Sequence, residues 1–167
     1  SGSVSLDSIR SLSERTGVLY PLQTFSANRP LDFSEIPCFV EGNDEEVTQT
    51  LLELAKSVSH EVNPLDSERR RTLHLAAVFA CNFVNHLYEV ASSQLEAQSL
   101  SPRWLLPLIT ETARKVSDLT PHDAQTGPAR RGDRRVIEAH LRLLDGQPTW
   151  QELYKIIIEI IYHQFHQ

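Results

Sequence analysis

His74 and Asn82 are polar residues in an otherwise apolar stretch of this sequence, and they are its best candidates for chemistry. Polar side chains in apolar surroundings need hydrogen-bond partners or a pocket. If the stretch is helical, a separation of eight residues places both side chains on one broad side, about 12 Å apart along the axis. The imidazole could then donate a proton while the amide orients a substrate. The alternative is two satisfied structural residues in a core. Cys81 is expected to lie on the buried face of the same helix as an inert thiol.

Gln23 and Thr24 form a second candidate pair. They follow the short apolar run 17–20, which predicts a buried strand that ends at Pro21. In open α/β sheets, ligands bind beyond the carboxyl ends of the strands, where these two residues would lie. Their amide and hydroxyl groups could hydrogen-bond a ligand. A plain strand-ending turn explains the same residues, so both interpretations stay open.

The stretch 126–135 is a third candidate, because a helix start coincides with a cluster of positive charge. Thr126 and the Gly-Pro pair after it are typical of a helix start. Asp133 would lie in the first turn, where the helix dipole favours a carboxylate. The functional interpretation is an anion-facing loop in which Arg131 contacts an anionic group and Asp133 orders that arginine. A well-formed helix start with a solvated basic face is the alternative. The four arginines are Arg130, Arg131, Arg134 and Arg135.

Several classes of site are not expected. The six glycines nowhere form G-x-G-x-x-G, so the chain has no phosphate-binding loop of its own. No pair of His or Cys has a ligand spacing, so no metal is expected. The net charge of −6 argues against nucleic-acid binding. No apolar run approaches the ~20 residues of a membrane span. The presence of only two cysteines suits a reducing compartment, which predicts a cytoplasmic location.

The hydrophobic spacing predicts two domains, 1–63 and 64–167. The first shows strand, strand, helix and strand in an order that belongs to an α/β sheet. The second reads as helical throughout, with a first helix so apolar that its middle is expected to be buried nearly all round. The predicted fold class is therefore an α/β remnant followed by an all-α helical bundle built on one long central helix. The expected strands are 17–20, 36–40 and 60–63, the helices are 5–14, 45–58, 67–98, 101–116, 129–145 and 149–165, and 26–34 and 119–128 are loops.

Four stretches carry a resemblance to one family. They are SGSVSL at 1–6, LYPLQTFS at 19–26, LHLAAVFACN at 73–82, and TGP with RGD within 126–133. Together they resemble the Rossmann-like proteins named as NADP oxidoreductases, which carry a C-terminal helical domain of unknown function, number 2520 of its series. In that family the glycine fingerprint precedes the first matched stretch. The resemblance therefore implies that this chain is the last part of such a protein, the end of a Rossmann-like sheet plus the helical domain.

One residue departs from the family. Many relatives have His where this sequence has Tyr20, which argues against a proton-transfer role at that position. The architecture is similar to that of pyrroline-carboxylate reductase-like proteins and of proteins with a C-terminal domain like that of 6-phosphogluconate dehydrogenase. In such proteins the active site lies between the domains, and the helical domains commonly form a dimer.

The resemblance implies an NADP-dependent oxidoreductase that transfers a hydride between nicotinamide and a small substrate. Gln23 and Thr24 would border the cofactor. His74 and Asn82 would be catalytic. Thr126, Arg131 and Asp133 would bind the substrate. The chain alone is not expected to be active. The alternative is a non-enzymatic ligand-sensing or assembly protein whose helical domain mainly mediates dimerisation, and a homodimer is expected in either case.

Overall fold

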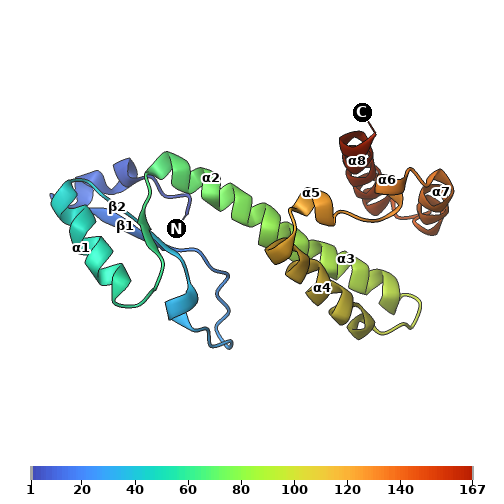
Figure 1. Ribbon diagram of the computed structural model, residues 1–167, viewed down its shortest axis with the longest axis horizontal. Helices are drawn as coiled ribbons and strands as arrows, with labels where there is room; N and C mark the ends of the chain where they lie inside the picture. The colour runs from blue at the N-terminus through green and yellow to red at the C-terminus, as the bar shows by residue number, and fades with distance from the viewer. Residues whose placement is uncertain (1, 167) are drawn as a thin grey trace. The chain divides into compact units, whose positions relative to one another are not determined.

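The computed structural model of the protein describes residues 2–166. The chain divides into two compact units, Ser1–Leu100 and Ser101–Gln167, and each unit is described by itself (Figure 1). The first unit keeps the beginning of the helical region together with the sheet. The domain boundary expected between residues 63 and 64 is a different division of the chain, and it stays a prediction.

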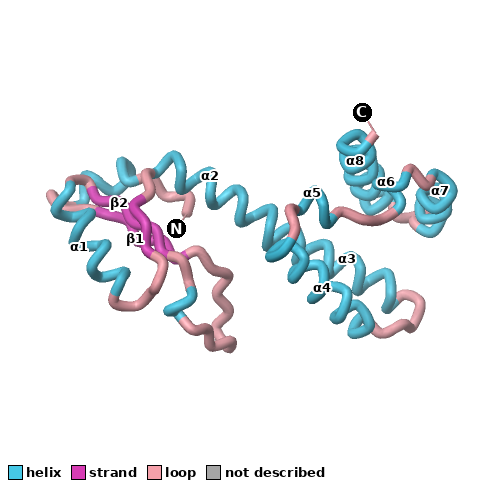
Figure 2. Tube along the Cα trace, viewed as in Figure 1, coloured by secondary structure: helices cyan, strands magenta, loops and turns pink. Residues whose placement is uncertain are grey.

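A three-stranded sheet forms the first half of the first unit (Figure 2). Its strands are β1 (Gly17–Pro21), β2 (Cys38–Gly42) and β3 (Val62–Pro64), in the spatial order β1-β2-β3. Strand β1 is antiparallel to β2, whereas β3 is parallel to it. The helix α1 (Glu45–Lys56) provides the crossover that a parallel pair requires. The predicted order of strand, strand, helix and strand is therefore confirmed, together with the α/β remnant.

The core of this unit lies between β2 and α1. Cys38, Val40 and Ala55 are fully buried there. Val47, on the same face of α1, is buried as well, which follows from its helical spacing to Ala55. Short 3₁₀ helices flank the strands: η1 (Leu6–Leu12) lies within the helix predicted at 5–14, and η2 (Phe33–Glu35) lies in and just beyond the predicted loop 26–34.

One long helix follows the sheet, as expected for residues 67–98. It consists of α2 (Ser67–Ala77), the π-helical turn η3 (Val78–Phe83) and α3 (Val84–Glu96). The carboxylate of Asp66 caps its start by accepting a hydrogen bond from the backbone N–H of Arg69. The sequence pattern did not reveal the π-helical turn, because its six residues are too few to change the steps of three and four residues that also fit an α-helix.

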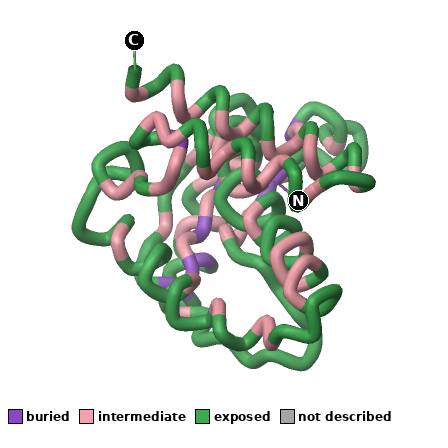
Figure 3. Tube along the Cα trace, turned by 90° about the vertical axis from the view of Figure 1, so that its right-hand side faces the viewer, coloured by how far each residue is buried: buried purple, intermediate pink, exposed green. Residues whose placement is uncertain are grey.

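The expectation that the middle of this helix is buried nearly all round is wrong. An apolar stripe runs along it at every fourth residue and is exposed in the described chain, with Phe79 61% accessible. Figure 3 shows mainly exposed and intermediate residues, with few buried ones. Within residues 2–166, Ala129 is the only apolar residue after Ala55 in the sequence that is fully buried. The high apolar content of this helix therefore indicates an exposed apolar surface and not a buried core. The stripe consists of Leu75, Phe79, Phe83 and Leu87.

The second unit is helical throughout, which confirms the predicted class of this part. Two details differ from expectation. The predicted loop 119–128 contains the short helix α5, which Thr120 caps. The helix predicted at 129–145 is two helices, because Gly132 adopts the left-handed conformation with φ +65° and ends the first of them. The elements are η4 (Pro102–Leu105), α4 (Leu106–Asp118), α5 (Pro121–Ala124), α6 (Pro128–Arg131), α7 (Arg134–Leu143) and α8 (Pro148–Phe165).

No helix within residues 2–166 is both long enough and apolar enough to cross a bilayer.

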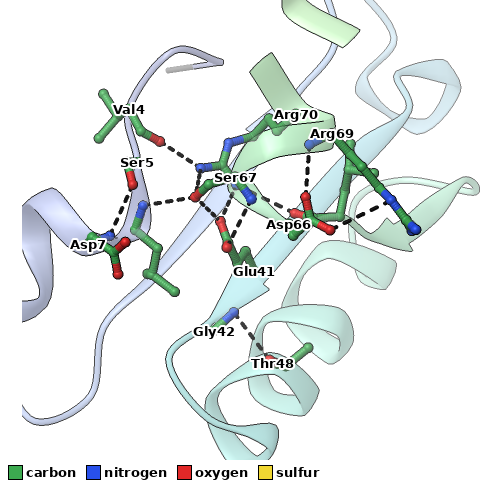
Figure 4. A network of polar contacts seen from close by, with 12 residues as sticks. Val4, Ser5, Asp7, Glu41, Gly42, Thr48, Asp66, Ser67, Arg69 and Arg70 are labelled. Carbon is green, nitrogen blue, oxygen red and sulfur yellow. Dashed lines mark hydrogen bonds and ion pairs between the residues drawn. The ribbon is translucent and has the colours of Figure 1, made fainter. Parts of the chain in front are cut away.

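A buried ion pair fastens the long helix to the sheet (Figure 4). Arg70 of α2 is 1% exposed, and its Nη1 lies 2.6 Å from Oε2 of Glu41 on β2. Its Nη2 donates to the carbonyl oxygen of Val4 at 2.6 Å, so the N-terminal segment is tied to the same group. Ser67 donates from both its hydroxyl and its backbone N–H to the Glu41 carboxylate. Three separate segments therefore meet at one guanidinium.

The pKa of Glu41 reflects this arrangement. Burial alone would raise the pKa of the carboxyl, but the hydrogen bonds from Ser67 and Arg70 outweigh it and hold the pKa below its ordinary value. The carboxylate is thus ionised at neutral pH and pairs with the guanidinium. Removing either partner would leave the other charge buried without its ion-pair partner.

We expect the substitution Arg70→Ala to lower the free energy of unfolding by about 3 kcal/mol, because the mostly buried Glu41 carboxylate loses its ion-pair partner. Chemical denaturation of the intact protein measures this. Arg69→Ala is the matched control. Arg69 pairs with Asp66 at 3.7 Å, and both side chains are more than half exposed, so its loss should cost less than about 0.5 kcal/mol. Equal costs for the two substitutions would contradict the assignment.

Candidate functional site

A pocket of about 440 Å³ lies in the first unit, between the end of β1 and the long helix. It brings together Gln23, Thr24, His74 and Asn82, four of the residues selected from the sequence. Two far-apart segments thus converge on one concave site, the usual arrangement of a ligand-binding pocket. The lining residues are Tyr20, Leu22, Gln23, Thr24, His74, Ala77, Ala80, Cys81 and Asn82.

A larger hollow, of about 580 Å³, lies along α8. Its lining residues include Ile156, Ile160 and His163, and all of them come from one face of that single helix. One helix face cannot enclose a ligand by itself. The pocket at β1 is therefore the better candidate site, although it is smaller.

The end of β1 positions Gln23 and Thr24. The backbone N–H of Leu22 donates to the carbonyl oxygen of Pro37 at 2.8 Å, which extends the pairing with the neighbouring strand past Pro21. The chain then turns, and the side-chain oxygen of Gln23 accepts a hydrogen bond from the backbone N–H of Thr24 at 2.8 Å. Within the described residues, the amide NH₂ of Gln23 and the hydroxyl of Thr24 keep no partner. Both groups are exposed and can bind a ligand.

His74 contacts Tyr20 across the pocket. The Tyr20 hydroxyl lies 3.3 Å from Nδ1 of His74, and the two rings meet edge to face with centroids 6.2 Å apart. Burial raises the pKa of the Tyr20 phenol, so the hydroxyl stays protonated. Tyr20 was not among the residues predicted for the site. Its position directly before Pro21 in the matched stretch 19–26 was the signal that could have found it.

The π-helical turn η3 orients Asn82. In a regular α-helix, residues eight apart are rotated by roughly 80° from each other around the axis. A π turn holds more residues, so each residue advances by a smaller angle, and Asn82 turns back toward the face of His74. Such turns are frequent at functional sites. Asn82 is exposed, which excludes the alternative of a satisfied core residue.

Cys81 is exposed and lines the pocket, so the expectation of a buried thiol is wrong. This prediction failed for the same reason as the predicted burial of the long helix, because an apolar sequence does not by itself indicate a core. The other cysteine, Cys38, is fully buried in the core of the sheet.

The three remaining predicted residues lie in the second unit. The carboxylate of Asp133 caps α7 by accepting from the backbone N–H of Val136 at 3.2 Å. Within the described residues no ion pair joins Asp133 to Arg131, and the expectation that it orders this arginine stays a prediction. Arg131 and Thr126 are exposed. Their proximity to a substrate, like that of Asp133, stays a prediction.

Arg130 differs from the other arginines of its cluster, because it is used structurally. Its guanidinium donates to the carbonyl oxygens of Asp123 and Gln125 and lies 5.0 Å from the centroid of the Phe165 ring. It therefore joins the loop before α6 to the end of α8. Within the predicted anion-facing loop 126–135, the guanidinium of Arg130 is therefore already bound by groups of the protein.

Among residues 2–166, no group of three or more His, Cys, Asp or Glu side chains lies close enough together to hold a metal ion.

Known proteins resemble this chain over nearly its whole length. The profile of the family described as "Domain of unknown function (DUF2520)" matches residues 36–160. A solved structure from Bacteroides fragilis, named a "putative NADP oxidoreductase", is 45% identical with a TM-score of 0.95. The match covers 98% of this chain but 63% of that one, so this chain spans less than two thirds of the related protein.

A second solved structure shows the same fold at lower similarity. It is a protein from Thermotoga maritima, 23% identical with a TM-score of 0.78, and the match covers 100% of this chain and 68% of that one. No curated protein sequence matches the chain.

We expect a thiol reagent such as Ellman's reagent to modify Cys81 but not Cys38 in the native protein, because only Cys81 is exposed. The absorbance should report one thiol per chain before denaturation and two afterwards. The variant Cys81→Ser should remove the native signal. Rapid modification of both thiols, or of neither, in the native state would contradict this prediction.

Proposed function

This chain belongs to the family of the domain of unknown function DUF2520, and we propose that it is the C-terminal part of an NADP-dependent oxidoreductase. The reaction would be hydride transfer between nicotinamide and a small-molecule substrate. The name of the Bacteroides fragilis protein supports the choice of cofactor and reaction class. Since this chain spans 63% of that protein, the activity belongs to the longer protein as a whole.

The observation that carries this proposal is the convergence of two groups in one pocket. Gln23 and Thr24 follow the end of β1 and line the pocket. His74 and Asn82 approach from the long helix. A cofactor group and a substrate could therefore be held side by side, which hydride transfer requires.

The residues at the end of β1 fit the carboxamide of a nicotinamide ring. That group carries one acceptor oxygen and one NH₂ donor. The free NH₂ of Gln23 can donate to the oxygen, and the hydroxyl of Thr24 can either donate or accept. The phosphate-binding glycine motif is absent from the sequence of this chain, so the pyrophosphate would have to be held elsewhere. Bound NADPH would supply the hydride.

His74 and Asn82 would act on the substrate. The imidazole would donate a hydrogen bond or a proton to the substrate oxygen as negative charge develops there. The Asn82 amide would orient the substrate. In the second unit, Arg131 would contact an anionic group, with Thr126 and Asp133 nearby. The cap that Asp133 provides to α7 already uses its carboxylate, so a structural contribution is the larger part of its proposed role.

We expect the intact protein to bind NADP in calorimetry and the substitutions Gln23→Ala and Thr24→Ala to weaken that binding by about 10-fold each, the loss of one hydrogen bond. Gln49→Ala is the matched control, because Gln49 is an exposed glutamine on α1 whose side chain, among residues 2–166, bonds only Glu53. It should leave the affinity unchanged.

The same measurements separate the cofactor from the chemistry. His74→Ala and Asn82→Ala should retain NADP affinity while lowering the oxidation of NADPH with a responsive carbonyl compound by about 100-fold or more. Absence of NADP binding by the intact protein would overturn the proposal. Unchanged turnover in both variants would overturn the assignment of the site.

A second candidate function rests on the exposed apolar stripe. The chain exposes 12180 Å², whereas two separate compact units of these sizes would expose roughly 10,000 Å² by the usual scaling. Apolar stripes of this length on helices usually mark interaction surfaces. In an assembly protein, the helical part would serve mainly for homodimerisation, and the stripe Leu75, Phe79, Phe83 and Leu87 would be part of the interface. Dimerisation is equally compatible with the oxidoreductase.

We expect the intact protein to sediment as a dimer at micromolar concentration, and Phe79→Glu with Phe83→Glu to weaken dimerisation by roughly 30-fold or more, because charges would be buried at the centre of the interface. Leu12→Glu is the control. Leu12 is 77% exposed on η1, away from the stripe, and its replacement should not change the sedimentation. A wild-type monomer would exclude the assembly function.

A further inference from the structure

We propose that Tyr20 is a positioning residue for His74: its hydroxyl donates to Nδ1 and thereby places the imidazole N–H on Nε2, which faces the pocket. This arrangement can be measured without any ligand. Its use in a reaction rests on the proposed oxidoreductase function.

The contact between the two side chains is well defined on both sides. Tyr20 belongs to β1, where it pairs with Phe39 of the neighbouring strand, so its backbone is fixed by the sheet. His74 belongs to α2, one turn after the buried Arg70, which anchors that helix to the sheet. The separation of 3.3 Å between Tyr20 Oη and Nδ1, with rings at an interplanar angle of 77°, thus joins two rigid elements.

Gly2 closes the same side of the imidazole. Gly2 is buried, and a Cβ placed on it would lie 2.8 Å from both Cγ and Nδ1 of His74 and 2.9 Å from Cβ. These atoms lie near the root of the side chain, so they could move only if the whole ring moved. Gly2 and Tyr20 therefore cover the Nδ1 edge, and the Nε2 edge remains for the pocket that His74 lines.

The hydrogen-bonding groups next to His74 determine which of its ring nitrogens carries the proton. A neutral imidazole carries a proton on one nitrogen and a lone pair on the other. The Tyr20 phenol keeps its proton, because burial raises its pKa, and it can donate to a lone pair on Nδ1. Within the described residues, Nε2 has no hydrogen-bond partner, so nothing in this part of the chain competes for its proton.

This tautomer decides what His74 can offer a substrate. With its proton on Nε2, a neutral imidazole donates a hydrogen bond into the pocket and can polarise a carbonyl or imine group. With the proton on Nδ1, it could only accept. Tyr20 would thus determine the direction of the hydrogen bond between His74 and the substrate without contacting the substrate itself.

The chain offers a matched control pair in its second unit. The hydroxyl of Tyr154 on α8 lies 2.8 Å from Nδ1 of His140 on α7, and these rings also meet edge to face, at 78° with centroids 5.7 Å apart. Neither residue lines the pocket at β1. The two pairs therefore share the same chemistry but differ in location.

The test is long-range ¹H–¹⁵N correlation NMR of the intact protein with ¹⁵N-labelled histidine, recorded without NADP at a pH at which the ¹⁵N shifts themselves report neutral imidazoles. The variant His74→Gln assigns the signals. We expect a protonated Nε2 and an acceptor Nδ1 for His74 in the wild type. Tyr20→Phe should shift the tautomer ratio toward Nδ1–H by roughly fivefold, the effect of one hydrogen bond. Tyr154→Phe should change the signals of His140 but not those of His74.

Two results would overturn the proposal: a wild-type His74 protonated on Nδ1, or identical His74 signals in the wild type and Tyr20→Phe. If Tyr20→Phe fails to fold, Gly2→Ala provides the second variant. It keeps the phenol but should displace the ring and change the His74 signals, and unchanged signals would also overturn the proposal. The expected tautomer in a protein that does not bind NADP would refute the oxidoreductase while the positioning by Tyr20 stands.

Discussion

The buried guanidinium of Arg70 is the constraint on which the first unit depends. It holds β2 through Glu41, the N-terminal segment through Val4, and its own helix through Ser67. The candidate pocket lies next to these elements. Tyr20 lies on β1, the strand paired with β2, and His74 lies on α2, one helical turn beyond Arg70. Gly2, which covers the imidazole, belongs to the segment that Arg70 fastens. The guanidinium of Arg70 thus connects the three parts of the chain that lie next to His74.

Local chemistry made much of this arrangement predictable. Pro21 and the apolar run before it located β1, and the spacing of Val47 and Ala55 located α1, because burial on one face leaves a periodic trace in the sequence. The rule that ligands bind at the carboxyl ends of strands suggested Gln23 and Thr24 as ligand contacts, whereas the family resemblance implied that His74 faces them. The broader identification required the family resemblance, since the residues alone left a plain turn and a structural pair open.

Other features left no local trace. The exposed stripe around Phe79 and the exposed Cys81 carry the same apolar pattern as a buried helix, and periodicity alone does not distinguish a core from a surface that another molecule covers. The contact of Tyr20 with His74 joins residues far apart in sequence. The sequence has a glycine at position 132, but the helical pattern on both sides of it predicted one continuous helix and not two.

The π-helical turn η3 has a consequence on both sides of the helix. Because each of its residues advances less around the axis, it also keeps Phe79 and Phe83 nearly in line, and their rings meet edge to face with centroids 5.0 Å apart. The same turn therefore sets the direction of Asn82 on one side and the alignment of the stripe on the other. A change in the winding of these six residues would rotate Asn82 and the stripe residues together.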